Sequence, residues 1–312
     1  MPEESLKLHS YPLVSIITVN YNHTDTTIEL IESLNHATYP NVEVIVVDNN
    51  SVTRDQFKIL EKHPSIRLVE SPVNYGFAAG SNYGIMLARG KYIFLLNNDC
   101  IVTPGFLEPL VEFMEEHPES GAVSPKIKYC DHPDIIQFAG FTAIHPITSR
   151  NYCIGHQEKD LGQYDQIRET AFTHGAAMMV PMNVILKAGM MSYAYFLYYE
   201  EADWCERIRR AGYKMHVIPQ SCIYHKESMS TGKYSTLKLY YLSRNRIMYI
   251  RRNFVGMNFI VAMLYQLFVA IPKNTFIHII SGKPKSVITY FKGIGWHLLN
   301  ISNTEIHENP SL

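Results

Sequence analysis

LVSIITV (residues 13–19), VEVIVV (residues 42–47) and YIFLL (residues 92–96) are three short apolar stretches, and a polar turn follows each of them. Together with residues 66–69 they predict four β-strands. Their nearly continuous hydrophobicity is typical of strands buried on both faces of a parallel sheet. Helical patterns lie between them, around residues 28–34, 57–60 and 77–88. We therefore expect an α/β fold with a doubly wound beginning.

Size and composition indicate a folded, globular chain. The 312 residues are 46% hydrophobic and 18% charged, which excludes a disordered, collagen-like or polytopic membrane protein. The length predicts one large α/β domain with an appendage, or two domains. Five scattered cysteines without CxxC spacing and a polar N-terminus predict a reducing, cytoplasmic setting.

The charge is distributed unevenly along the chain. A formal net charge of -1 argues against a nucleic-acid binder. Residues 1–227 contain 27 acidic and 18 basic residues, whereas residues 228–304 contain ten Lys or Arg and no Asp or Glu. The basic C-terminal region predicts an anionic partner. We expect the domain boundary between residues 232 and 233, with a helical, basic region over 233–312.

The stretch FVGMNFIVAMLYQLFVAI (residues 254–271) is apolar enough to approach a membrane. It carries no charge, but Gly256, Asn258 and Gln266 interrupt it, and we expect Pro272 to end its helix. Three interpretations remain open: a helix in the membrane interface, a helix packed on the core, and a true span. The flanking basic residues favour the interfacial helix on an anionic membrane surface.

Polar clusters follow the predicted strands, and in open α/β sheets ligands bind at these strand ends. Asn97, Asn98 and Asp99 come directly after YIFLL, and Asp48 ends the second strand. The carboxylate of Asp99 can hold Mg²⁺ or Mn²⁺, both of which prefer oxygen ligands. The carboxylate of Asp48 can accept a hydrogen bond from the imide N–H of a pyrimidine or from a ribose hydroxyl. The simpler alternative for each cluster is an Asx-rich turn.

The segment NYGFAAGSNYG (residues 74–84) is not a dinucleotide-binding turn. Gly76, Gly80 and Gly84 recur every four residues, which is typical of one closely packed helix face and leaves Asn74 and Gly76 free to face a ligand. A nucleotide-dependent oxidoreductase needs a glycine-rich turn after the first strand. That turn, VNYNHTDTT, contains no glycine, which argues against this class.

The stretch FLYYEEADWCERIRRAGY (residues 196–213) is the most informative one. Asp203 with Arg207, and Glu206 with Arg210, have the spacing of ion pairs on one solvated or ion-paired helix face. Glu200 and Glu201 remain, and they are either helix-start residues or a general base whose pKa the aromatic flank raises. Further on, His225 precedes a polar loop over residues 226–234 that could close as a lid over a diphosphate.

The chain resembles family 2 glycosyltransferases of the GT-A fold, which have a Rossmann-like, mostly parallel sheet flanked by helices. The motifs that carry the resemblance are, in this order, VSIITVNYN, VVDNNS, NYGFAAGSNYGI, FLLNND, HGAAMMV, YYEEADWCERIRRAGY and YH. The subgroup resembled is the bacterial rhamnosyltransferase and galactofuranosyltransferase type. The resemblance runs from about residue 14 to about residue 252, and the ordered set is far more specific than any single motif.

The resemblance implies roles for individual residues. Val19, Tyr21 and Asp48 would hold the donor nucleotide together with Asn74, Gly76 and Asn98. Asp99 would be the carboxylate ligand of Mg²⁺ or Mn²⁺, with Asn97 in place of the first acid of the DXD motif, and His225 would complete the metal site. Glu201, the second member of the acidic pair with Glu200, would be the catalytic base. From position alone we expect the acceptor near Gly175 and Trp204.

These roles imply a reaction and a place in the cell. A sugar would move, with inversion, from a dTDP-rhamnose-like or UDP-sugar donor to a glycan or polyprenyl-diphosphate-linked acceptor of bacterial surface polysaccharide. The enzyme would lie peripherally on the inner face of the cytoplasmic membrane, and a homo-oligomer remains open. The alternative is a non-catalytic GT-A relative that binds a nucleotide sugar or glycan.

Overall fold

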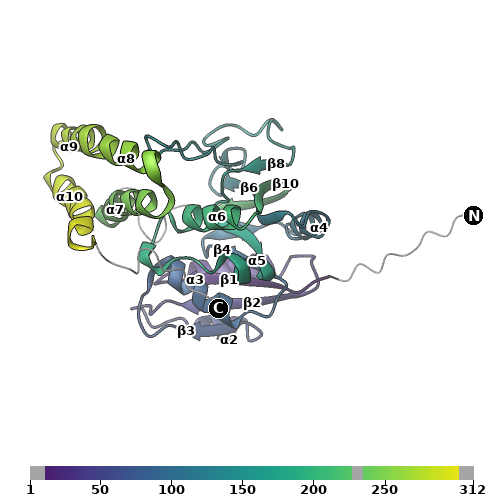
Figure 1. Cartoon of the computed structure of the whole chain (residues 1–312). Coiled ribbons are helices and arrows are strands. Elements are labelled where there is room, and N and C mark those ends of the chain that lie inside the picture. The colour runs from purple at the N-terminus through teal and green to yellow at the C-terminus, as the bar shows by residue number, and fades with distance from the viewer. Residues whose placement is uncertain (1–10, 227–234, 302–312) are drawn as a thin grey trace, which may run out of the picture.

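A computed structural model of the chain describes residues 11–226 and 235–301. In this part ten strands form one mixed sheet, in the order β3-β2-β1-β4-β9-β6-β10-β5, with β7 beside β6 and β8 beside β10 (Figure 1). The strands are β1 (Val14–Asn20), β2 (Val42–Asp48), β3 (Arg67–Glu70), β4 (Tyr92–Leu96), β5 (Cys100–Val102), β6 (Ser120–Tyr129), β7 (Ile136–Phe138), β8 (Arg168–Thr170), β9 (Ala177–Pro181) and β10 (Lys214–His225).

Helices cover both faces of the sheet and continue into a C-terminal group of helices at one side of the molecule (Figure 1). They are α1 (Thr24–Leu34), α2 (Lys58–Lys62), α3 (Gly76–Leu87), α4 (Glu108–Glu116), α5 (Met182–Ala188), α6 (Glu200–Arg210), α7 (Thr236–Asn253), α8 (Gly256–Tyr265), α9 (Ile271–Ile280) and α10 (Pro284–Leu299), with a 3₁₀ turn η1 (Tyr193–Tyr195) and a π turn η2 (Gln266–Ala270). The α/β class expected from the sequence is confirmed.

The four predicted strands form a parallel block. β1 pairs in parallel with both β2 and β4, and β2 pairs in parallel with β3. Neighbouring side chains on β1 enter different parts of the core, Ile16 on one face and Ile17 on the other, and both are about 1% exposed. Burial on both faces explains why these strands are continuously apolar.

The second half of the sheet is less regular. β9 inserts antiparallel between β4 and β6, and β10 pairs in parallel with β6 but antiparallel with β5. β10 runs to His225 across a register shift between Ile218 and Cys222. This extension carries His225 to the same sheet edge as the loop after β4.

The glycines of α3 allow the close packing that their spacing predicts. A Cβ at Gly84 would lie 2.4 Å from Cγ2 of Ile17, and one at Gly80 would lie 3.2 Å from Cγ1 of Val19. Gly76 has φ +81°, and a Cβ there would lie 2.2 Å from the carbonyl oxygen of Phe196. Only glycine allows this approach and backbone conformation, so the helix starts directly against the loop before α6.

The C-terminal helix does not end at Pro272, contrary to the sequence prediction. Gly256–Ile280 is one continuous apolar helix of 25 residues, long enough to cross a membrane. Proline is tolerated because it occupies the first turn of α9, directly after the π turn η2, where the regular hydrogen-bond pattern is already interrupted. The expected domain boundary at 232/233 and all but the first residue of the predicted lid lie outside the described residues.

Candidate active site

A cavity of about 380 Å³ opens where β1, β2 and β4 end. Val19, Tyr21, Asn74, Gly76 and Asn98, all predicted to contact the donor, line it. The further lining residues come from separate parts of the chain: Asn49, Phe77, Asn97, Asp99, Gln137, His174, Gly175, Ala176, Phe196, Leu197, Tyr198, Glu200, Glu201, His225, Leu237 and Lys238. The cavity therefore lies where the strand ends of the parallel block predict a ligand site.

Asp48 differs from the prediction. It is 1% exposed, and it is not among the described residues that line the cavity. Its carboxylate accepts hydrogen bonds from Nδ2 of Asn20 (2.8 Å) and from the backbone N–H and hydroxyl of Ser51 (2.9 and 2.6 Å). Asp48 thus orders the loop after β2, and the next residue, Asn49, lines the cavity instead.

Asn49 connects the loop after β2 with the start of α3. Its Nδ2 donates to Oδ1 of Asn74 and to the carbonyl of Gly76, both at 3.0 Å, and its Oδ1 accepts from the N–H of Tyr75 at 3.1 Å. Both sides of its amide are therefore used to fix the start of α3. Sequence reasoning singled out the acid of this motif, although the amide beside it is the residue at the cavity.

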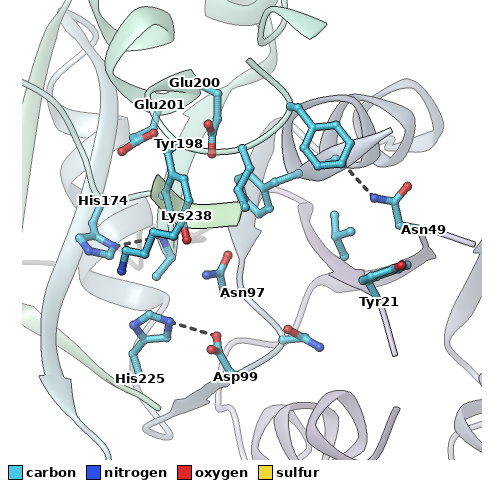
Figure 2. A pocket seen from close by; sticks show the side chains of 18 of the residues that line it. Tyr21, Asn49, Asn97, Asp99, His174, Tyr198, Glu200, Glu201, His225 and Lys238 are labelled. Atoms are coloured by element: carbon cyan, nitrogen blue, oxygen red, sulfur yellow. Dashed lines mark hydrogen bonds and ion pairs between the residues drawn. The ribbon is translucent and has the colours of Figure 1, made fainter. Parts of the chain in front are cut away.

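Asp99 and His225 meet although 126 positions separate them. The antiparallel pairing of β10 with β5 places His225 opposite Cys100. Nε2 of His225 lies 3.0 Å from Oδ1 of Asp99, and Nδ1 lies 2.8 Å from Oε1 of Gln137 (Figure 2). Since an amide oxygen only accepts, Nδ1 carries a proton, and in the neutral ring the lone pair of Nε2 points toward the carboxylate.

This arrangement fits a divalent cation. A carboxylate oxygen suits Mg²⁺ or Mn²⁺, and an imidazole nitrogen is more typical of a transition metal, such as Mn²⁺, than of Mg²⁺. An outer hydrogen bond such as that to Gln137 orients a ligating histidine. Cys100 lies close enough to join them, but burial raises its pKa well above the usual range. Its Sγ donates to the carbonyl of Ala176. Mg²⁺ and Mn²⁺ also prefer oxygen ligands to thiols, so we assign the proposed site to Asp99 and His225.

Glu200 and Glu201 begin α6 on the side of the cavity opposite Asp99 and His225 (Figure 2). Glu200 is 4% exposed, and its Oε2 has no hydrogen-bond partner within residues 11–226 and 235–301. Burial, with the charge of Glu201, raises the pKa of Glu200 well above the ordinary value. Burial also raises the pKa of Glu201, but backbone hydrogen bonds at the helix start oppose that rise. Glu201 is therefore the member that ionises more readily.

Gly175, which was expected near the acceptor, lies beside this pair. A Cβ on Gly175 would lie 3.8 Å from the carboxyl carbon of Glu201, so its backbone is in near contact with that side chain. Trp204, by contrast, is 0% exposed, and its Nε1–H donates to the carbonyl of Gly189. The predicted acceptor role of Trp204 is therefore wrong for this structure, because one turn of α6 beyond Glu200 points the indole into the core.

The predicted ion pairs of α6 have different surroundings. Glu206 pairs with Arg210 at the surface, as expected. Asp203 is 1% exposed rather than solvated, and it contacts Arg207 and Arg252. Burial opposes the ionisation of Asp203, but the two guanidinium groups outweigh it and hold its pKa below the ordinary value. This buried cluster ties α6 to α7.

Sequence reasoning missed His174 and Lys238 at the cavity. His174 accepts the N–H of Ala176 at Nδ1 (3.1 Å), so its proton is on Nε2. Burial, with the nearby ring of His225, lowers the pKa of His174 to about 3, and the ring is neutral. His174 opens the motif HGAAMMV, which was a usable signal. No sequence pattern indicated Lys238, since residues 233–312 were expected to form a separate C-terminal region.

Comparison with known proteins identifies the family. Residues 15–179, just over half of the chain, match the sequence model described as "Glycosyl transferase family 2". The chain belongs to glycosyl transferase family 2. The resemblance inferred from the sequence motifs is thus confirmed for this family.

Relatives of this family 2 chain extend beyond the matched region. An N-acetylglucosaminyl-diphospho-decaprenol L-rhamnosyltransferase of Mycobacterium tuberculosis is 22% identical over 242 residues, which cover 71% of this chain and 78% of that protein. The uncharacterized protein y4gI of Sinorhizobium fredii is 26% identical over 85% of this chain, but the chain spans only 30% of its length. A glucosyltransferase of Escherichia coli named for UDP-Glc and α-D-GlcNAc-diphosphoundecaprenol is 35% identical over 33% of this chain and 41% of that protein.

Solved structures show the same fold. The mannosyltransferase PcManGT of Pyrobaculum calidifontis, in complex with GDP-Man and Mn²⁺, superposes with a TM-score of 0.55 at 15% identity, over 94% of this chain and 77% of that one. TarS of S. aureus has a TM-score of 0.59 at 15% identity, over 94% and 50% of the two chains. The GT-A fold expected for family 2 is confirmed.

Proposed function

We propose that this chain is an inverting, metal-dependent glycosyltransferase. It would move a sugar from a nucleoside diphosphate donor, dTDP-rhamnose-like or a UDP-sugar, to a hydroxyl of a glycan or lipid-linked glycan. The observation that carries the proposal is one cavity in which Glu200 and Glu201 lie opposite Asp99 and His225. The names of two relatives contain diphosphate-linked polyprenols, which supports such an acceptor in bacterial surface polysaccharide synthesis.

Glu201 is the proposed general base. An acceptor hydroxyl is a poor nucleophile, so a carboxylate must remove its proton as the oxygen attacks the anomeric carbon. The bond from that carbon to the diphosphate oxygen breaks as the new bond forms, and the electron pair leaves with the nucleoside diphosphate. Attack opposite the leaving group inverts the anomeric centre. Burial and the charge of Glu201 raise the pKa of Glu200 further, so Glu200 is the member that ionises less readily.

The other side of the cavity handles the leaving group. Asp99 and His225 would hold a divalent cation, Mg²⁺ or Mn²⁺, which when bound supplies charge stabilisation for the departing diphosphate. Lys238, whose ammonium lies 5.7 Å from the centre of the Tyr198 ring, adds a cation on the cavity wall. Tyr21 and Asn49, which lie away from Lys238 and His225 in Figure 2, remain with Val19 for the nucleoside.

The C-terminal helices would hold the enzyme on the inner face of the cytoplasmic membrane. Only 17% of the most apolar window of the helix Gly256–Ile280 is buried. We name the exposed apolar side chains of α8, η2, α9 and α10 the apolar helix face; its members include Met257, Leu267, Phe268, Phe276, Ile280 and Leu299. Lys273, Lys283 and Lys285 are exposed on the same helices, where they could meet anionic headgroups. The π turn, Pro272 and Lys273 within this helix favour a position in the plane of the interface.

The test of the proposed function is calorimetric titration with UDP-, dTDP- and GDP-sugars, each with and without Mn²⁺ or Mg²⁺. We expect one nucleotide class to bind only with metal, and Asp99→Ala to weaken that binding at least about tenfold through loss of a ligand. Asp55→Ala, a change of the same type at a surface carboxylate outside the cavity lining, serves as the control. Absence of binding by any nucleotide sugar under every metal condition would contradict the donor site.

A further inference from the structure

The loop that carries the acidic pair has an unusual backbone. Phe196, Tyr198 and Tyr199 have φ angles of +62°, +68° and +76°, a region that residues with a Cβ rarely occupy. All three precede Glu200 directly or by a few residues, and Tyr199 is the N-cap of α6. Such a conformation persists only where surrounding contacts hold it. The contacts that hold this loop therefore decide where the carboxylates of α6 lie.

Asn245 of α7 supplies the central contact. It is 0% exposed, and its Nδ2 lies 3.0 Å from the carbonyl oxygen of Tyr195, 2.7 Å from that of Leu197 and 2.7 Å from that of Tyr198. Two N–H bonds are shared among three carbonyls of the left-handed loop. The side-chain amide of Asn245 thus donates to backbone carbonyls that in a regular helix or strand would accept from backbone N–H groups.

Arg244 completes this contact from the neighbouring position. Its Nε donates to Oδ1 of Asn245 at 2.8 Å, which fixes the amide with its NH₂ toward the loop. Nη2 of Arg244 donates to the carbonyls of Ala194 (2.6 Å) and Tyr195 (2.7 Å). The guanidinium is packed between aromatic rings, 4.8 Å from the Tyr241 centroid and 5.1 Å from that of Trp296. These contacts leave it little freedom to move.

The far end of α7 holds α6 itself. Arg252 donates to Asp203 at 2.8 Å, and Nδ2 of Asn253 donates to the same carboxylate oxygen at 2.9 Å. The hydroxyl of Tyr195, in η1, also lies 3.1 Å from this oxygen. Two anchoring points on α7 thus hold the acidic pair: Arg244 and Asn245 hold the loop before it, and Arg252 and Asn253 hold Asp203 after it.

We propose that Asn245, oriented by Arg244, is a positioning residue for the acidic pair, so that α7 is part of the catalytic machinery of this chain. The inference rests on the proposed function of Glu201 as general base. Asn245 is not among the described residues that line the cavity, so it acts through the loop and not on the substrate. The bulk of the C-terminal region then serves the membrane, whereas α7 serves the chemistry.

The test is Asn245→Asp, which keeps the shape but replaces the donating NH₂ with an oxygen that repels the three carbonyls. In a transfer assay we expect kcat to fall on the order of 100-fold, because a displacement of about 1 Å is enough for such a loss. The donor KM should stay within about threefold, since the interaction lost is one needed only for the chemical step. Arg244→Lys, which keeps the charge but removes the fork, should lower kcat about tenfold in the same way.

Two controls separate positioning from a general loss of stability. Asn41→Asp makes the same chemical change at a residue whose amide donates to the carbonyl of Tyr11, at the opposite edge of the sheet. Ile59→Ala removes a fully buried side chain next to α1 and β2 and lowers stability without touching the loop. Both should keep kcat within about twofold of the wild type when measured well below their unfolding temperatures.

Amide hydrogen exchange at residues 196–199 gives a readout independent of turnover. We expect faster exchange there in Asn245→Asp and unchanged exchange in Asn41→Asp. Wild-type kcat in Asn245→Asp, or an equal loss in Ile59→Ala, would overturn the positioning role while leaving the proposed function intact. If the wild type transfers no sugar, the proposed function fails, and unchanged exchange in Asn245→Asp would still overturn the inference on its own.

Discussion

Two adjacent glutamates have different surroundings, and that difference assigns their roles. Glu200 is almost completely buried and has a carboxylate oxygen without a hydrogen-bond partner among the described residues, whereas Glu201 is partly exposed and is supported by backbone groups at the start of α6. Two carboxylates so close together do not ionise independently. The more buried member ionises less readily, and we propose that its neighbour acts as the base.

The first prediction is that Glu200→Gln is tolerated. A neutral amide has the charge of the protonated acid, so kcat should stay within about fivefold of the wild type. The pH dependence of kcat gives a second test. The base works only when it is ionised, and its pKa is raised, so kcat should fall as the pH is lowered, with a midpoint above the ordinary glutamate pKa of about 4.3. Glu200→Gln should keep this acidic limb in place. A kcat lost as fully as in Glu201→Gln would contradict the assignment.

The sequence indicated many of the residues that line this cavity, because they follow strand ends or open a helix. The sequence could not show which of Asp48 and Asn49 faces the cavity, since the direction of a side chain after a strand end depends on the turn that follows. Nor could it exclude Trp204, because the rotation of α6 is fixed by Asp203 and by segments about 50 residues away. Asn245 gave no signal, since a single amide in a helix looks like a surface residue.

At the scale of elements, α3 shows how spacing specifies packing. Its glycines let the helix lie directly on β1 and β2, and this position brings Asn74 and Gly76 to the cavity. The strands and helices of the first half were predictable because each has its own period. The antiparallel insertion of β9 between β4 and β6 was not, because strand order depends on contacts between distant segments and not on local pattern.

Gly84→Ala tests this packing. Alanine favours a helix over glycine by about 1 kcal/mol, but its Cβ would lie 2.4 Å from Ile17, and forcing extra volume into a packed site costs about 1–3 kcal/mol. We therefore expect a net loss of stability in urea unfolding. Gly105→Ala, where the nearest atom to the new Cβ is 4.0 Å away, is the control and should not lose stability through a clash. Equal or greater stability of Gly84→Ala would show that α3 can move away from the sheet.

At the scale of the whole molecule, the described parts of the chain combine the cavity at the ends of β1, β2 and β4 with a group of exposed apolar helices. These helices lie on one side of the fold (Figure 1). α10 packs on α7, where a Cβ on Gly293 would lie 2.8 Å from the carbonyl oxygen of Tyr240. The helix Gly256–Ile280 remains largely uncovered by the rest of the chain. The membrane and the acceptor would thus approach through the C-terminal helices, which are joined to α7 and through it to the loop before Glu200.

Vesicle flotation tests the apolar helix face. The wild type should float with vesicles containing phosphatidylglycerol and much less with phosphatidylcholine alone, because lysines next to anionic lipid add about 1 kcal/mol each. Leu267→Ser with Phe268→Ser should reduce flotation at least about tenfold, in line with the apolar area withdrawn from the bilayer. Leu186→Ser, at an exposed leucine of α5, should not. Resistance to alkaline carbonate extraction would contradict a helix lying in the plane of the interface.

The central claim is that Glu201 accepts the proton of the acceptor hydroxyl. The most direct measurement compares single-turnover sugar transfer by the wild type, Glu201→Gln and Glu206→Gln at saturating donor and acceptor. Glu206 is on the same helix but pairs with Arg209 and Arg210 at the surface, so its amide variant should transfer normally. For Glu201→Gln we predict a rate lower by about 10²–10⁴-fold with donor affinity unchanged. A rate within about threefold of the wild type, in a variant that folds and binds donor normally, would contradict the account.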